Sequence, residues 1–220
     1  MGIISVTQAD NLYWLGRYTE RVYTTVKMYN KSFDDMIDEA EDSYPDFCAK
    51  MDIPNIYKDK EDFMYRYPYD PENPDSISSN LIRAYDNAIV LRESIGSETL
   101  SYIQLAIYDW NKAAINPAPL IETQKLIDHI MAFWGIADDM IDNEEVRNIL
   151  KAGKRIERID LYARLGMPRH RLQREIHRLI PRVQKCGLNY NEDHLNNLVT
   201  LVEAPEIDYY KVVSEVENII

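Results

Sequence analysis

The chain combines 220 residues with a net charge of −12, from 25 lysines and arginines against 37 aspartates and glutamates. This acidity argues against general binding to nucleic acid, and no apolar run is long enough to cross a membrane. The two cysteines lack a CxxC spacing and the first residues lack a signal-peptide pattern. We therefore expect reduced thiols in a single cytoplasmic domain over residues 1–220.

A long first helix is predicted from about residue 7 to about residue 41. Apolar residues and one threonine recur there at spacings of three and four, the pattern of one buried helix stripe. The stripe consists of Leu12, Leu15, Thr19, Val22, Val26, Tyr29, Phe33 and Met36. Its length predicts a central helix of a bundle.

Residues 43–75 differ in composition from the rest of the chain. They contain five prolines, many tyrosines and several acids. The aromatic content is too high for a disordered linker, so we expect an ordered insertion or lid after the first helix.

Helical periodicity returns after this insertion and continues to the end of the chain. Ser76 or Ser78 can cap the next helix, and Gly96 interrupts it. The predicted helices cover about 77–95, 97–116, 119–134, 143–165, 168–184, 192–202 and 206–216. No segment alternates polar and apolar residues long enough for a sheet, so the class is all-α, a bundle of about six to eight helices.

Two matching cores suggest an internal pseudo-repeat. Residues 16–22 read GRYTERV and residues 153–159 read GKRIERI, 137 positions apart. In both, an adjacent Glu-Arg pair lies beside the apolar stripe, about 100° from a buried position, where half-covered charges need partners. A glycine one turn before each glutamate leaves room for a neighbouring helix or a ligand.

The charged residues near these cores are the candidate site. If the bundle closes, they meet in one network with a third polar set that includes Arg83, Asn87 and Glu98. The expected substrate-binding residues are Arg17, Arg21, Asn87, Arg92, Glu93 and Arg158, and the candidate catalytic residues are Glu20, Glu98 and Glu157. Two interpretations stay open: buried salt bridges that fix helix register, or arginines that bind a carboxylate or phosphate while a glutamate acts as base.

Three blocks of the sequence resemble a known family, the alpha-E domain proteins. They are residues 9–21, residues 86–98 with the sequences DNA, LRESI and SE, and residues 153–160. The second core has Lys154 where the family more often has arginine. The resemblance implies a helical domain, often encoded beside a circularly permuted ATP-grasp ligase and a transglutaminase-like cysteine protease.

The resemblance therefore implies a function as accessory or partner domain in the synthesis of a peptide or amide. In that hypothesis an anionic small molecule or peptide is the ligand. The Arg side chains anchor its anion, and Glu20 and Glu157 hold those Arg side chains or accept a proton.

A basic segment and repeated acid strings give competing signals. Residues 147–185 carry twelve basic residues against three acids, and the strip from Arg169 to Arg182 packs against acidic parts of the same chain or holds an anionic partner. The string DDMID at 34–38 and 138–142 is typical of Mg²⁺-dependent prenyl transfer, so an independent transferase stays an alternative, as does a purely structural interaction protein. No Glu-x-x-His pair occurs, and we assign no metal site or cofactor.

Overall fold

The computed structural model describes residues 4–38, 43–115 and 119–220, and this part of the chain is all-helical. Eleven helices are described there, more than the six to eight expected, because the insertion adds two short helices and a third follows Leu91. In chain order they are α1 (Val6–Asp38), α2 (Tyr44–Met51), α3 (Lys60–Arg66), α4 (Ile77–Val90), α5 (Arg92–Ile95), α6 (Ser97–Ala113), α7 (Pro119–Met140), α8 (Glu144–Arg164), α9 (Arg169–Lys185), α10 (Glu192–Glu203) and α11 (Tyr209–Glu217).

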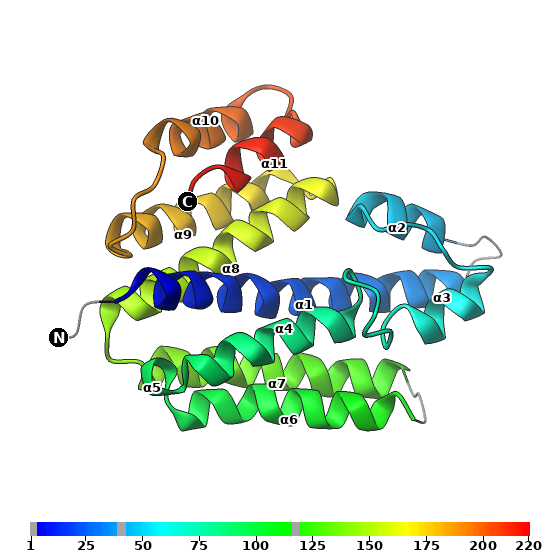
Figure 1. The fold of residues 1–220 in the computed structure, drawn as a ribbon. Coiled ribbons are helices and arrows are strands. Elements are labelled where there is room, and N and C mark those ends of the chain that lie inside the picture. The colour runs from blue at the N-terminus through cyan, green and yellow to red at the C-terminus, as the bar shows by residue number, and fades with distance from the viewer. Residues whose placement is uncertain (1–3, 39–42, 116–118) are drawn as a thin grey trace.

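Helix α1 lies between two layers of the molecule (Figure 1). One layer contains α4, α6 and α7, and the other contains α8 to α11. The stripe predicted for α1 is buried from Leu12 to Tyr29; the side chains of Phe33 and Met36 lie outside the described residues. Because α1 contacts helices on both sides, more of its circumference is covered than a single stripe implies.

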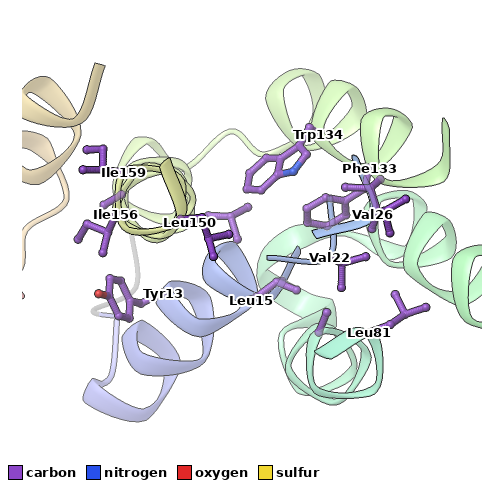
Figure 2. Close-up of a cluster of buried hydrophobic side chains, with 14 of the residues drawn as sticks. Tyr13, Leu15, Val22, Val26, Leu81, Phe133, Trp134, Leu150, Ile156 and Ile159 are labelled. Atoms are coloured by element: carbon purple, nitrogen blue, oxygen red, sulfur yellow. The ribbon is translucent and has the colours of Figure 1, made fainter. Parts of the chain in front are cut away.

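The main core combines side chains from α1, α4, α7 and α8 (Figure 2). Leu15 and Val22 of α1 point into it, and Phe133 and Leu150 enter from α7 and α8. All four are at most 1% exposed. Burial of each such side chain contributes about 2 kcal/mol, so this cluster holds α1 to both layers.

Residues 43–75, which contain α2 and α3, pack through aromatic rings near the C-terminal end of α1 (Figure 1). Phe63 is fully buried and its ring contacts those of Tyr44, Phe47, Tyr57 and Tyr67. The segment is therefore packed through ring stacking and ring-edge contacts, which explains its aromatic composition.

Asparagine and serine side chains cap the starts of several helices. Asn143 accepts hydrogen bonds from the backbone N–H groups of Glu145 and Val146 at 2.9 and 3.2 Å, which starts α8. Ser76, and not Ser78, caps α4, since it accepts from the Ser79 N–H at 3.0 Å. These caps satisfy donors that a helix leaves unpaired in its first turn.

Helix α7 runs past the predicted end near Trp134 to Met140. Gly135, directly after Trp134, lies on the exposed side and does not interrupt the helix, and Ala137 and Ile141 continue the buried face. Among the described residues, no helix is both long and apolar enough to span a membrane.

Candidate functional site

Two glycines allow α1 and α8 to touch through their backbones. A Cβ atom on Gly16 would lie 2.1 Å from the carbonyl oxygen of Leu150, and one on Gly153 would lie 2.1 Å from that of Tyr13. Such distances are far below van der Waals contact, so only glycine fits at either position. The crossing places the two Glu-Arg pairs opposite each other one turn further along.

Each glutamate pairs with the arginine of the other helix. Arg158 donates from Nε and Nη2 to the two carboxylate oxygens of Glu20, at 2.6 and 2.7 Å. Arg21 donates from Nε to Oε1 of Glu157, and Arg17 donates to Oε2 of the same carboxylate at 2.6 Å. The Glu-Arg pairs of α1 and α8 therefore form two reciprocal ion pairs between the helices.

The carboxylates of this network are deeply buried. Glu20 is 0% and Glu157 is 1% exposed, which exceeds the half burial expected from their position beside the stripe. The layer on each side of α1 accounts for the difference. Glu20 also accepts a hydrogen bond from the Thr24 hydroxyl at 2.8 Å, so every carboxylate oxygen in the network has a donor.

The arginines stay charged in this setting. Burial alone lowers the pKa of Arg17 and Arg158, but Glu157 and Glu20 respectively raise both above the ordinary value. Removal of one glutamate would leave guanidinium groups buried without an anion, which costs about 3 to 5 kcal/mol. The network is thus a strong link between α1 and α8.

The Glu-Arg pairs match the motif of a known protein family. The Alpha-E family model, described as a predicted alpha-helical domain with a conserved ER motif, matches residues 7–211. The chain belongs to the Alpha-E family. No curated protein and no solved structure matches it.

Lys154 takes the place in this Alpha-E chain that Arg17 takes in the first core. Its Nζ lies 3.7 Å from the centroid of the Trp134 ring, a cation-π contact, and Arg17 lies over Trp14 at 4.9 Å. Burial lowers the pKa of Lys154 to about 7, and the nearby charge of Glu20 only partly offsets this effect. Lys154 is therefore the one cation of the two cores that ionises near neutral pH, within the described residues.

A third buried acid, Glu175 of α9, was not identified from the sequence. It is fully buried and pairs with Arg155, with Arg174 and Arg178 at 3.2 Å, and with Arg158 at 3.8 Å. Burial raises its pKa, but Arg155, Arg158 and Arg178 together lower it below the ordinary value. The available signal was its position, because Glu175 interrupts the apolar stripe of α9 at helical spacing from Leu172.

A fourth buried acid, Asp160, lies between the network and a cavity. Its Oδ1 accepts from Arg164 Nε at 2.9 Å, while its Oδ2 lies 4.0 Å from Arg21 Nη2 and has no hydrogen-bond partner in the described structure. Burial, and then the charge of Glu157, raise the pKa of Asp160 to about 6. The spacing of Asp160 from Glu157 and Arg164, three and four residues, was the signal that sequence analysis did not use.

Beside Asp160, α1, α2 and α8 enclose a cavity of about 120 Å³. Its charged lining residues are Arg21, Asp52, Asp75 and Arg164. A larger groove of about 600 Å³ adjoins it between α2, α8 and α11, and both hollows share Asp52 and Arg164. These two residues form an ion pair of 3.4 Å at the boundary. Arg21 is the predicted site residue that faces this open space.

The third polar set lies apart from the buried network. Arg92, Glu93 and Glu98 are exposed, and Arg92 donates to the Ser97 hydroxyl at 3.0 Å. Asn87 donates to the backbone oxygen of Arg83 one turn earlier, at 2.8 Å. The expected single network is therefore wrong in extent: these side chains lie on α4, α5 and the start of α6, which turn them away from the crossing.

The basic strip of α9 is used largely within the protein. Arg169 donates to the backbone oxygens of Val202 and Pro205 at 2.7 and 2.8 Å, and Arg182 donates to Asn148 at 2.9 Å. These contacts attach α9 to α8, to the end of α10 and to the segment that follows it, through neutral acceptors rather than the acidic residues that the internal interpretation expected.

The second acid string does not line the cavity. Asp138 pairs with Lys151, and Asp139 and Asp142 are exposed. The side chains of residues 34–38, the first string, lie outside the described residues. In the described part of the chain, no group of three His, Cys, Asp or Glu residues is placed to hold a metal ion.

Proposed function

We propose that this domain is the accessory partner of an ATP-grasp-type peptide or amide ligase and binds a carboxylate of that system's substrate. The observation that carries the site is the cavity beside the Glu-Arg network, where Arg21 and Arg164 face about 120 Å³ of open space. Guanidinium groups held in fixed orientation bind carboxylates through paired, charge-assisted hydrogen bonds. The ligase association is what the alpha-E resemblance implies.

In this proposal the buried part of the network has a positioning role. Glu157 holds Arg21 and Arg17, and Glu20 holds Arg158, so the orientation of Arg21 is fixed from inside the protein. Asp160 fixes Arg164 in the same way. A guanidinium whose rotamer is already set loses less conformational entropy when a ligand binds.

We also propose that the two cores are copies of one helical unit. Support comes from equivalent positions that meet reciprocally. Gly16 contacts the helix of Gly153 as Gly153 contacts that of Gly16, and Glu20 pairs with Arg158 as Glu157 pairs with Arg21.

The test of the accessory role uses the protein together with the ATP-grasp ligase and the transglutaminase-like protein of the same system. Size-exclusion chromatography with mass detection, with and without ATP and magnesium, measures complex formation. We expect a stable complex with the ligase. Independent elution under all of these conditions would refute the partnership.

The site is tested in the same complex with Arg164→Gln and, as control, Arg171→Gln on the surface of α9. Both changes remove one positive charge, but Arg171 is exposed and contacts only Met167 among the described residues. We expect Arg164→Gln to reduce ligase turnover at least about 10-fold and Arg171→Gln to leave it unchanged. Equal turnover in both variants, with both folded, would remove the site from the proposal.

A further inference from the structure

The small cavity is lined by acids as well as by arginines. Asp52 and Asp75 face the same space as Arg21 and Arg164. Asp52 is paired with Arg164, but the Asp75 carboxylate has no ion-pair partner in the described structure. A ligand that carries only a carboxylate would satisfy the arginines and would be repelled by the two aspartates.

The surroundings of the cavity contain more acids than bases. Arg21 already pairs with Glu157, and Arg164 pairs with Asp160 and Glu217. Behind both arginines lies the buried Asp160, whose Oδ2 has no hydrogen-bond partner in the described structure. The charge that this region lacks is therefore positive, and an ammonium group would supply it.

The raised pKa of Asp160 reports the same imbalance. Its two largest causes are burial and then the negative charge of Glu157. Arg164 and Arg21 lower the pKa, but they do not restore the ordinary value.

We propose that the cavity binds the head group of an α-amino acid in its zwitterionic form. The carboxylate lies between Arg21 and Arg164, and the ammonium group lies at Asp75 with Asp52 beside it. This inference rests on the proposed function and adds the second charged group of the ligand. In this inference the domain binds the amino acid that the amide ligase joins, through the amine or the carboxylate of that amino acid, to the rest of the product.

The dimensions fit such a ligand. A volume of about 120 Å³ corresponds to roughly four water molecules at ~30 Å³ each, which is the size of an amino acid head group. The boundary between the cavity and the groove of about 600 Å³ is the ion pair of the exposed Asp52 with the half-buried Arg164. A longer side chain extends across this boundary, between Val213 and Tyr209 of α11 and the end of α8.

The test compares four small probes on the full chain: glycine, L-alanine, acetate and methylamine. Ligand-observed NMR titration measures each dissociation constant at one ionic strength. We expect glycine and alanine to bind at least about 10-fold more tightly than acetate or methylamine, because only they satisfy both charged pairs.

Asp75→Asn and Asp86→Asn form a matched pair of variants. Each removes one negative charge, but Asp86 is exposed on α4 and is not among the residues that line the cavity. We expect Asp75→Asn to weaken alanine binding about 10-fold and to leave acetate binding unchanged or tighter. Asp86→Asn should change neither, and thermal unfolding checks that both variants are folded.

Three results separate this inference from the proposed function. If acetate binds as tightly as alanine and Asp75→Asn weakens neither, the amino acid inference is overturned and the carboxylate site stands. If methylamine binds and acetate and alanine do not, both the carboxylate site and the zwitterion are wrong. If none of the four probes binds at concentrations up to about 100 times the dissociation constant expected for such small ligands, both are refuted.

Discussion

Alanine at Gly16 should separate the two helices that carry the Glu-Arg pairs. The new Cβ would lie 2.1 Å from the Leu150 oxygen and 3.0 Å from the Lys154 nitrogen. Both are backbone atoms, so no side chain can rotate to make room. Contact at about 3.5 Å requires the Cβ and the Leu150 oxygen to separate by about 1.4 Å, so the helices must move apart at the crossing.

The cost follows from two opposing effects. Overpacking a tight contact costs about 1 to 3 kcal/mol, and the movement also stretches the buried bonds between Glu20 and Arg158, now 2.6 and 2.7 Å long. Alanine recovers about 1 kcal/mol over glycine inside a helix. We expect a net loss of about 2 kcal/mol in the free energy of unfolding, the upper end of this balance because the buried bonds are stretched as well, or about 4 to 8 °C in Tm for a chain of this size.

Gly135→Ala is the matched control for this experiment. Gly135 also lies inside a helix, α7, but a Cβ there would meet no atom within 4 Å. Urea and thermal unfolding should show Gly135→Ala stabilised by up to about 1 kcal/mol and Gly16→Ala destabilised. Equal stabilisation in both variants would refute the close backbone contact. The double variant of Gly16 and Gly153 should lose less than the sum of the single losses, because one separation of the helices accommodates both.

Three further variants test the buried charges. Glu157→Gln should lower the free energy of unfolding by about 3 kcal/mol in urea titrations, because Arg17 and Arg21 lose their anion. Lys154→Met should be more stable than the wild type at pH 7. Folding lowers the pKa of Lys154 from 10.5 to about 7, so the protonated lysine destabilises the folded state. The advantage of the variant, up to about 5 kcal/mol, should shrink as the pH rises toward 10.5. Compared with that of Asp160→Asn, the free energy of unfolding of the wild type should fall by about 3 kcal/mol as the pH rises from 3.8 through 6. The reason is that the folded state binds the Asp160 proton more tightly than the unfolded state does.

The two pH predictions have opposite signs, so each variant serves as a control for the other. Rising pH should favour the wild type relative to Lys154→Met and disfavour it relative to Asp160→Asn. Unfolding free energies of all three proteins at five or six pH values between 4 and 10 measure both trends. A constant difference for either variant would show that the group has its ordinary pKa in the folded state.

The sequence was sufficient for the helices because each carries its own periodic signal. The eight long helices were all predicted, and the stripe from Leu12 to Tyr29 is buried as expected. The short helices α2 and α3 were not predicted, because segments of seven or eight residues show no clear period, and α5 was expected as the end of a single helix over 77–95.

The candidate site was only partly predictable because it depends on which faces meet. The matching spacing of the two cores identified Glu20, Arg21, Glu157 and Arg158, and these side chains do meet. Spacing could not show that α5 lies beyond the crossing, so the exposed Glu93 was included with them. The cavity was equally invisible, since Asp52 and Asp75 come from the insertion and reach Arg164 only through tertiary packing.

The pairing of α1 with α8 also affects the order in which the protein can fold during synthesis. Helix α1 leaves the ribosome early, but Arg158, the partner of Glu20, follows 138 residues later. Until then Glu20 must stay in water, because burial without Arg158 is too costly. Helix α1 can associate early with α4, but it can acquire its other neighbour only after α8 has emerged, so the ribosome-bound chain passes through a stage in which one whole layer of the bundle is absent.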